Sequence, residues 1–456
     1  MTAWRSHTAW LARAASLLVV ALLAACGGGG GSADPVANTP TVAAPASCSV
    51  ADQRSWLRSY MNDQYFWYAN QGTPNESAAS MDAYFQSLLY KPTDRYSYTQ
   101  PTAQFTQFFS EGTQTGYGYS LAFPDAAATH FKVRFVEPAS PVGQAGLLRG
   151  ETVVSIDGYN SQQIAAGALP SVTTAGVSRS FTIVNAAGTT RTFSVNSANY
   201  AFATVPVSKV FSVPAAGGGT AKVGYLLLQQ FVSGSSGALA TAFNDFRTAG
   251  VTELVVDLRY NGGGSSTVAR NLASMLGGST LDGQTFAQFR YNDKQSARNF
   301  SYPFTTSGLP AAPIEGLSRV IFISSASTAS ASELVINGLK PFRKVVQIGT
   351  TTFGKPYAFQ PREACGTTYN AVSLESVNAA GVGGFTAGIA PDCTVADDLT
   401  RQLGDAAEGR LSAALNYVST GACPASASLE SARAVGGGAA LETAYGEAAR
   451  PQMRID

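Results

Sequence analysis

Histidine is nearly absent from this chain of 456 residues, which contains only His7 and His130. His7 lies in a segment that we expect to be removed, so the mature protein would keep one imidazole. Catalytic and structural metal sites built on histidine need two or three such ligands, and no metal is therefore expected. A Ser–His–Asp or Cys–His centre would need His130 as its base. Because His130 precedes an expected strand, we interpret it as a surface or groove residue.

Other absences exclude further classes of protein. Beyond the first 25 residues no run reaches 18 consecutive apolar residues, so we expect no transmembrane helix. Charged residues make up 13 % of the chain, with 30 Lys and Arg against 29 Asp and Glu, and no basic tract indicates a nucleic-acid partner. The glycine-rich segments have neither the P-loop nor the dinucleotide spacing, so no cofactor is expected. The hydrolase pattern G-x-S-x-G is also missing.

Residues 1–25 have the three parts of an export signal. Arg5 and Arg13 are followed by the apolar run Ala14–Ala25, which is too short to span a bilayer. The run ends in Leu-Ala-Ala before Cys26, and this ending resembles the lipobox of bacterial lipoproteins. The resemblance implies a lipid anchor on Cys26 and a flexible tether over 26–47. Gly27 rather than Asp after the cysteine favours the outer membrane, facing the periplasm. The alternative is an ordinary secretory signal with a chance cysteine.

Export would place the remaining four cysteines in an oxidising compartment. They allow three pairings. We favour Cys365–Cys393 together with Cys48–Cys423, because the second bond would join the two ends of the folded body. A zinc site is the alternative, but no C-x₂-C spacing supports it.

Periodicity predicts several domains. Apolar residues at helical spacing in Arg54–Tyr68 and Met81–Tyr90 predict a small helical N-terminal domain over 48–112. A β-rich domain follows over 113–199, with expected strands at Phe131–Val136, Thr152–Ile156, Ser180–Val184 and Arg191–Val195. Ala201–Gly219 reads as a linker. Residues 425–456 are rich in Ala, Gly and Ser and are expected to be disordered.

Strands and helices alternate over 200–424. The expected strands are Lys222–Leu228, Glu253–Leu258, Arg319–Ile323 and Val345–Ile348. The expected helices between them are Ser235–Ala249, Ser266–Leu276 and Ala331–Leu339. This alternation is typical of a mostly parallel sheet covered by helices. The predicted fold class is therefore multidomain α/β.

The segment 113–199 resembles a PDZ domain. The order Ser-Pro, Ala-Gly-Leu, Gly-Glu and Ile-Asp-Gly between residues 140 and 158 carries the resemblance. It implies that the loop Gly116, Tyr117, Gly118, Tyr119 binds a peptide carboxylate, since glycines let backbone N–H groups converge on an anion. The alternative is a PDZ fold that acts only as a spacer.

Two loops at strand ends have the composition of a reaction centre. The first is Asp257–Gly264, whose three glycines expose amides beside a helix N-terminus and can hold an oxyanion. The second is Ser327–Glu333, which opens a helix. Taken alone, the first loop is equally well a structural turn. The second also fits a capping box, with Ser330 at the N-cap and Glu333 three residues later.

The two loops together with Lys355 resemble the C-terminal processing (tail-specific) peptidases over most of residues 49–423. The resemblance implies Ser330 as nucleophile and Lys355 as general base, with the amide of Ala331 and one from Gly262 or Gly263 as oxyanion donors. Burial would bring the lysine pKa toward roughly 7–8, so that its neutral amine could accept a proton.

The sequence departs from the family pattern after the lysine. The family often has a glutamine four residues after it, whereas here Phe359 occupies that position and Gln360 follows. Gln360 would reach Lys355 through a bulge, or the dyad would act without it.

The implied function is a serine endopeptidase of the bacterial cell envelope. Its partners would be protein or peptide substrates and, through the lipid anchor, a membrane, with the PDZ domain binding substrate C-termini or gating the site. One alternative is a non-catalytic peptide-binding or scaffold lipoprotein, and another is an esterase or amidase that acts on small substrates. Neither the natural substrate nor the oligomeric state follows from the sequence.

Overall fold

The computed structural model describes residues 43–124, 128–425, 445–446 and 452–455. The expected export signal, the lipidation site Cys26 and most of the tether lie outside these ranges. Within them, no helix is both long enough and apolar enough to cross a membrane.

The N-terminal region is helical, as the spacing of its apolar residues predicts. Helices α1 (Val50–Gln64) and α2 (Met81–Leu88) begin at Ser49 and Ser80, whose side chains cap the first turn. Their buried aromatic side chains pack against residues from the far end of the chain, including Phe359 and Tyr369. This shared core fixes the helical region to the strands that follow the expected lysine.

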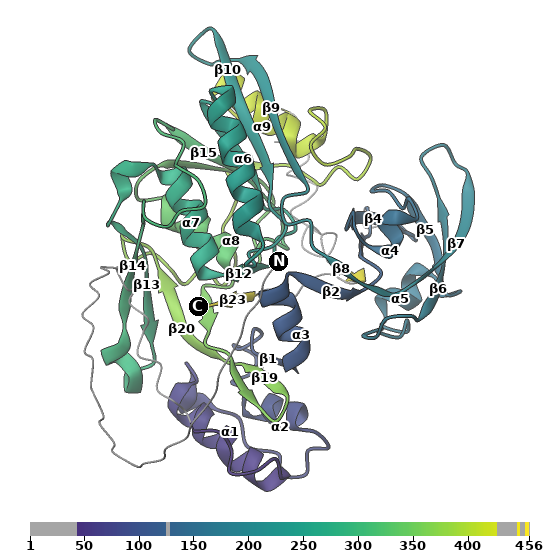
Figure 1. Ribbon diagram of the computed structural model, residues 1–456, viewed down its shortest axis with the longest axis vertical. Helices are drawn as coiled ribbons and strands as arrows, with labels where there is room; N and C mark the ends of the chain where they lie inside the picture. Colours follow the sequence, from purple (N-terminus) through teal and green to yellow (C-terminus); the bar gives the residue numbers. More distant parts are fainter. Residues whose placement is uncertain (1–42, 125–127, 426–444, 447–451, 456) are drawn as a thin grey trace, which may run out of the picture. The chain divides into compact units, whose positions relative to one another are not determined.

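The central sheet has six strands in the order β21-β16-β15-β11-β10-β9 (Figure 1). It is parallel except at β9, which runs antiparallel to β10. Its strands are β9 (Val207–Pro214), β10 (Thr220–Leu227), β11 (Glu253–Asp257), β15 (Arg319–Ser324), β16 (Lys344–Gly349) and β21 (Cys393–Thr394). Strand β9 lies in the segment predicted to be a linker, and that prediction is wrong because these residues pair along the edge of β10.

Apolar side chains alternate between the two faces of the central sheet, since successive residues of a strand point to opposite sides. On β11, Leu254 and Val256 join the core beneath α6 (Ser235–Ala249), α7 (Ser266–Gly277) and α8 (Ala331–Leu339). Val255 points the other way and packs with residues of α9 (Gly409–Thr420). The sheet is therefore covered on both faces, as buried parallel strands require.

A second six-stranded sheet has the order β12-β23-β17-β20-β13-β14. Its strands are β12 (Gly263–Ser265), β13 (Thr285–Tyr291), β14 (Phe300–Pro303), β17 (Tyr357–Phe359), β20 (Val372–Val377) and β23 (Gln452–Arg454). It is antiparallel apart from the two pairings of β23. The prediction of a mostly parallel sheet therefore does not describe the core as a whole. The second sheet was missed because the short strands after the lysine carry no strong apolar periodicity.

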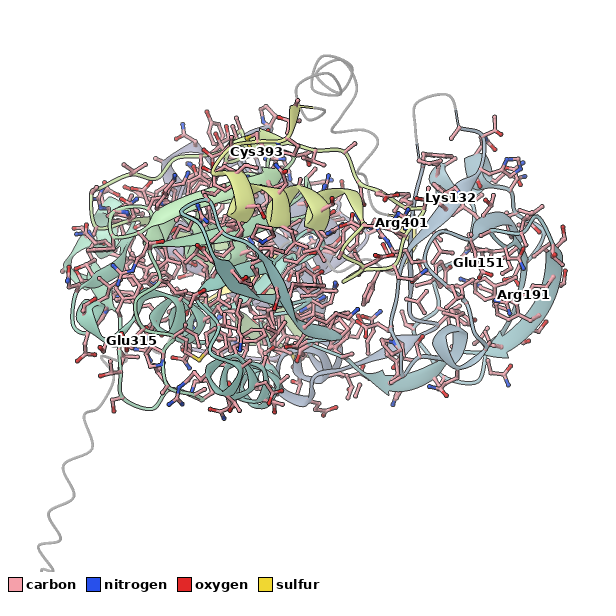
Figure 2. All side chains as sticks on the ribbon, turned by 90° about the horizontal axis from the view of Figure 1, so that it is seen from above. Lys132, Glu151, Arg191, Glu315, Cys393 and Arg401 are labelled. Carbon is pink, nitrogen blue, oxygen red and sulfur yellow. A yellow bond between two sulfur atoms is a disulfide. The ribbon has the colours of Figure 1, made fainter. Side chains whose placement is uncertain are left out.

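The segment 113–201 forms a separate small sheet and a two-stranded ribbon. The sheet has the order β22-β3-β4-β5-β6-β7 and is antiparallel. Its strands are β3 (Tyr119–Ala122), β4 (Phe131–Val136), β5 (Thr152–Ile156), β6 (Ser178–Val184), β7 (Thr190–Asn196) and β22 (Tyr445–Gly446), and the ribbon pairs β2 (Thr113–Gly116) with β8 (Ala198–Ala201). An ion pair of 3.2 Å joins Arg191 to Glu151 across it (Figure 2).

A smaller sheet has the order β1-β19-β18 and joins the N-terminal region to the core. Its strands are β1 (Tyr98–Pro101), β18 (Arg362–Ala364) and β19 (Thr367–Asn370). The remaining helices are short: α3 (Thr102–Thr106), α4 (Pro141–Gln144) and α5 (Ser161–Ala165).

The prediction of disorder over 425–456 fails where β22 and β23 form, because pairing with other strands orders residues whose composition alone would not. The other residues of that segment from 426 to 451, and residue 456, lie outside the described ranges.

All four remaining cysteines are in disulfides, but the favoured pairing is wrong. The bonds are Cys48–Cys365 and Cys393–Cys423. The first attaches the start of the helical region to the loop between β18 and β19. The second ties the end of α9 to β21. The separation of the cysteines along the chain did not predict their pairing, because the pairing depends on which strands lie beside which ends of the chain.

The ends of the central strands are held by a buried charge cluster. The guanidinium of Arg259 is fully buried and contacts Asp257 at 2.8 Å and Glu408 at 2.6 Å. Asp397 adjoins it at 3.3 Å and also accepts from Arg149 at 2.9 Å. Burial would raise the pKa of Asp397, but Arg149, Arg410 and Arg259 hold that pKa well below its usual value. The cluster connects the loop after β11 to the start of α9.

We expect Arg259→Met to lower the free energy of unfolding by about 3–5 kcal/mol, because it leaves buried carboxylates without their counter-charge. Chemical denaturation of the oxidised protein measures this. Arg401→Met is the matched control, since Arg401 is half exposed and lies 3.6 Å from Asp405 (Figure 2); it should change stability by less than about 1 kcal/mol. Equal losses in the two variants would contradict the role assigned to Arg259.

Candidate active site

Ser330 lies at the turn between β15 and α8, in a backbone conformation unusual for its type. Its φ is +63°, in a region that residues other than glycine rarely adopt. Such strain persists only where the surroundings impose it, and it is common at functional sites. The side chain is fully buried, and its Oγ has no hydrogen-bond partner within the described ranges. A hydrogen bond between Ser330 and Lys355 is therefore not formed in this structure.

Lys355 is fully buried, as the resemblance implies for a lysine base. Burial holds its pKa well below the ordinary 10.5, and the charges of Asp94 and Glu333 oppose that effect only in part. Its Nζ lies 3.5 Å from the centre of the Phe359 ring. Burial disfavours the ammonium form, so the neutral amine, which can accept a proton, is more accessible than in an exposed lysine.

The buried carboxylate of Glu333 joins the serine and the lysine. Its Oε2 accepts the backbone N–H of Ser330 at 2.7 Å and that of Lys355 at 2.9 Å. Its Oε1 accepts from Gly354 N at 2.7 Å and Thr352 Oγ1 at 2.5 Å. Burial raises the pKa of Glu333, while these hydrogen bonds lower it. The Glu333 half of the predicted capping box is present, but its main effect is to hold two distant loops together.

Asn261 attaches the glycine loop to the serine loop. Its backbone carbonyl accepts from Ala329 N at 3.0 Å and Ser332 Oγ at 3.1 Å. Its side-chain oxygen accepts the amide of Gly263 at 2.8 Å. Gly263 is therefore already paired, and of the two glycines predicted as oxyanion donors Gly262 is the better candidate. Ala331 opens α8, so its amide is among the first-turn donors that have no acceptor inside the helix.

Gly264 is required by a close backbone approach. A Cβ built on it would lie 2.0 Å from the carbonyl oxygen of Phe231, and its φ is +140°. Phe231 pairs with the loop through the bonds Phe231 N to Gly263 O at 3.1 Å and Ser265 N to Phe231 O at 2.7 Å. Glycine at position 264 is therefore needed for this close packing of two backbones.

Three residues that sequence reasoning left without a role support the lysine loop. In the structure Arg95 Nη2 donates to Phe353 O at 2.9 Å, and Tyr96 Oη donates to Gly354 O at 2.8 Å. Asp94 is fully buried and supplies negative charge near Lys355. The role of this segment depends on contacts with residues 258 positions away in the chain.

Gln360 does not occupy the position predicted for it. Its side-chain amide donates to Tyr291 Oη at 2.7 Å, and its oxygen accepts from Arg298 at 3.2 Å. A bulge does occur between Ala358 and Phe359, but it places the Phe359 ring, not this amide, beside the lysine. His130, the alternative base considered in the sequence analysis, is exposed, and its Nδ1 lies 3.0 Å from Thr129 Oγ1.

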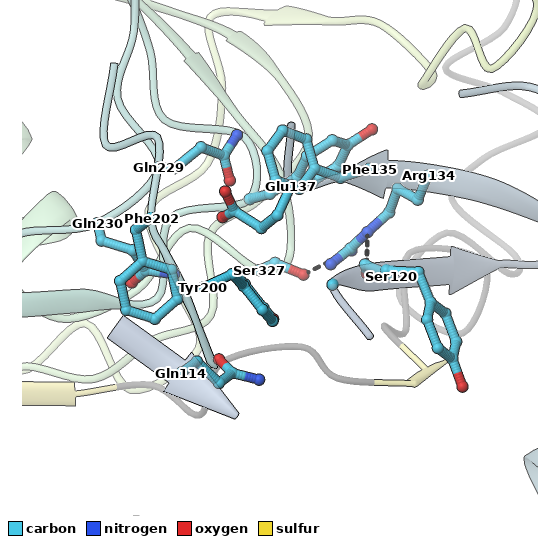
Figure 3. A pocket seen from close by; sticks show the side chains of 13 residues that line it. Gln114, Ser120, Arg134, Phe135, Glu137, Tyr200, Phe202, Gln229, Gln230 and Ser327 are labelled. Carbon is cyan, nitrogen blue, oxygen red and sulfur yellow. Dashed lines mark hydrogen bonds between the residues drawn. The ribbon is translucent and has the colours of Figure 1, made fainter. Parts of the chain in front are cut away.

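A pocket lies where the small sheet meets the glycine loop and the serine loop (Figure 3). Arg134 of β4 donates to Ser327 Oγ of the serine loop at 3.0 Å and to Ser120 Oγ of β3 at 3.1 Å. Its guanidinium also stacks 4.3 Å from the ring centre of Tyr260, in the glycine loop. Burial raises the pKa of Glu137, on the same wall, to about 7. The expected peptide-binding loop, at Tyr117 and Gly118, thus adjoins a surface that contacts both the glycine loop and the serine loop.

Comparison with known proteins identifies the chain's relatives. Residues 222–395 match Peptidase family S41, and residues 52–98 match the Peptidase S41 N-terminal domain. A Bacteroides fragilis protein designated an S41 protease has a crystal structure with a TM-score of 0.64, 26 % identity and coverage of 80 % of this chain and 97 % of that one. The photosystem II D1 C-terminal processing protease shares the fold, with a TM-score of 0.50, 20 % identity and coverage of 82 % and 98 %.

Curated relatives are similar over part of their length. The chloroplastic C-terminal processing peptidase of Tetradesmus obliquus is 25 % identical over 252 residues, which are 54 % of this chain and 52 % of that protein. The carboxyl-terminal-processing protease of Picosynechococcus is 26 % identical over 218 residues, 48 % and 49 % of the two chains. The matched region therefore spans about half the length of these relatives.

Glu333→Gln tests the link between the two loops. The amide NH₂ would face two of the four hydrogen-bond donors, so we expect a loss of about 2–4 kcal/mol of stability. Chemical denaturation measures it. Glu315→Gln is the control, because Glu315 is exposed and accepts only from Ser279 N, at 3.1 Å (Figure 2); it should cost less than about 0.5 kcal/mol. A neutral effect of Glu333→Gln would refute the link.

Proposed function

The chain belongs to peptidase family S41, and from that membership and the geometry of its two loops we propose that it is a serine peptidase that cleaves protein substrates, with Ser330 as nucleophile and Lys355 as general base. The observation that carries the proposal is the fully buried Lys355, which Glu333 attaches to the strained serine turn. Burying a lysine amine costs free energy, and a reaction that needs a neutral amine accounts for its burial.

The reaction begins when a substrate carbonyl lies beside Ser330. Neutral Lys355 takes the Oγ proton while Oγ bonds to the carbonyl carbon. The oxygen becomes an anion, which the amides of Ala331 and Gly262 stabilise. Removing one donor of this kind typically costs about 3–4 kcal/mol of barrier.

The tetrahedral intermediate collapses by breaking its C–N bond. Lys355, now an ammonium, returns the proton to the leaving amine. A water molecule then hydrolyses the acyl-enzyme with Lys355 again as base, which frees the new carboxyl end and restores Ser330.

The missing Ser330–Lys355 hydrogen bond is compatible with this mechanism, because catalytic hydrogen bonds in unliganded enzymes are often long and shorten when substrate binds. It also favours the second candidate function, a non-catalytic peptide-binding or scaffold protein that keeps the fold. Labelling of Ser330 by a serine-reactive probe separates the two, and peptide cleavage separates a peptidase from an esterase.

The small sheet is proposed to be a PDZ domain that binds substrate C-termini or gates the site. Its β3 edge follows the loop Gly116–Tyr119, and strand addition at such an edge recognises an extended peptide. The contacts of Arg134 with Ser327 and Tyr260 support the gating role, since a shift of β4 would displace both catalytic loops.

The site of action is proposed to be the bacterial cell envelope, with the body anchored through Cys26 and facing the periplasm. The export signal in the sequence and the two disulfides support an oxidising compartment.

Ser330→Ala and Lys355→Met should each lower kcat/KM on an unfolded protein substrate by roughly 10⁴-fold or more. Both variants should remain folded by circular dichroism. Wild-type rates in either variant would exclude the dyad.

The pH–rate profile tests the lysine directly. Only neutral Lys355 accepts the serine proton, so kcat/KM should rise with pH and fall away as pH drops through the lysine pKa. The midpoint should lie below 10.5, the ordinary value for a lysine. If kcat/KM stayed constant or fell as the pH increased into the alkaline range, Lys355 would be excluded as the base. Lys355→Arg, which cannot deprotonate, serves as the control and should be inactive at every pH.

Gln360→Ala tests the departure from the family pattern. Because the Gln360 amide is bonded to Tyr291 and Arg298, its removal should change kcat by less than about threefold. Phe359→Ala removes the ring beside the Lys355 amine and should move the midpoint of the pH–rate profile upward, since the ammonium would then be better solvated. A loss of two or more orders of magnitude in Gln360→Ala would restore this glutamine as a positioning residue.

A further inference from the structure

Strand β23 inserts between the two halves of the candidate active site. It lies parallel to β12, with Gly263 opposite Gln452 and Ser265 opposite Arg454. On its other side it is parallel to β17, with Phe359 opposite Arg454. Figure 1 places β23 beside β12. The C-terminal strand thus bridges the strand that follows the oxyanion loop and the strand that follows Lys355.

The insertion continues one residue beyond the strand. The amide of Ile455 donates to the carbonyl of Phe359 at 3.1 Å, and Ile455 packs against the main hydrophobic core. Phe359 is the residue whose ring covers the Lys355 amine. The C-terminal residues therefore contact Phe359, the residue against which the amine of the proposed base packs.

Strand β22, from the same end of the chain, lies along β3, the edge at which we propose that a peptide binds. Tyr445 pairs with Leu121 and Gly446 with Ser120, antiparallel to β3. This is the edge of the small sheet next to Tyr117 and Gly118. In the sheet order β22 lies outside β3, so it is added to an edge and is not part of the sheet's interior.

Backbone pairing of this kind does not depend on the sequence of the added strand, because main-chain groups supply the hydrogen bonds. Any extended polypeptide could form the same pairs. A segment attached to the chain competes at an effective concentration of about millimolar, set by its tether. It would outcompete substrates present at lower concentrations.

We propose that β22 and β23 form a tethered pseudosubstrate, which occupies the edge of β3 in the small sheet and the strand position between β12 and β17. It lowers the activity of the same chain until a substrate displaces it. The occupant is this chain's own C-terminal segment. The inhibitory part of the inference rests on the proposed peptidase function, whereas the occupancy does not.

The first experiment measures occupancy without catalysis. A fluorescent synthetic peptide of residues 445–456 is titrated into Ser330→Ala protein, in the full chain and in a chain that ends at residue 444, by fluorescence anisotropy. The shortened chain should bind the peptide at least about tenfold more tightly, because its site is no longer filled in cis. Equal affinities, or no binding to either, would overturn the occupancy.

The second experiment measures activity. Removing residues 445–456 should raise kcat/KM on an unfolded protein substrate by at least about tenfold. Adding the peptide back should raise the apparent KM and leave kcat unchanged. A folded, shortened chain with unchanged or lower activity would overturn the inhibition, since β23 would then complete the site instead of filling it.

A point variant keeps the test decisive if the shortened chain does not fold. Ile455→Pro removes the N–H that Phe359 accepts and should raise kcat/KM in the full chain. Ile455→Val keeps that donor and should raise kcat/KM much less than Ile455→Pro does. Similar rates in the two variants would overturn the inhibition. If no variant cleaves any substrate but the anisotropy result holds, the peptidase function fails and the occupancy stands.

Discussion

The carboxylate of Glu333 is the constraint on which the site depends. It is fully buried and accepts four hydrogen bonds, two from the backbones of Ser330 and Lys355 and two from the residues before the lysine. Because a buried carboxylate is costly unless its oxygens are paired, the fold must bring these donors together. The strained turn at Ser330, the lysine loop and the start of α8 therefore form one unit, although the two key residues belong to different loops.

The other parts of the molecule hold this unit from outside. Asn261 and Thr328 pair the glycine loop with the serine turn, while Arg95 and Tyr96 hold the carbonyls of the lysine loop. Arg259 fixes the strand ends below them. The small sheet contacts both loops through Arg134. The edge of β3 and the position between β12 and β17 thus adjoin residues that hold the turn at Ser330.

Local sequence predicted what depends on local physics. The helices α1, α2 and α6–α8 and the central strands β10, β11, β15 and β16 follow from apolar periodicity, and their predicted bounds differ from the structure by a few residues at most of their ends. The roles of Ser330 and Lys355 were predicted through the resemblance to the C-terminal processing peptidases, since the serine loop taken alone also fits a capping box. Strand β9, the second sheet and the strands β22 and β23 were missed, since short edge strands gain their stability from neighbours that are remote in the chain.

The sequence alone indicated the family and the two candidate catalytic residues through a resemblance, and its two histidines led us to expect neither a histidine base nor a histidine-rich metal site. Tertiary structure decided which cysteines pair, because strand placement sets their separation. It decided that Phe359, not Gln360, lies against the lysine, because a bulge sets which side chain faces the site. It also decided that the amide of Gly263 is paired with Asn261 and that β23 lies between β12 and β17. Each of these depends on which backbones are adjacent in space, and one-dimensional spacing does not contain that information.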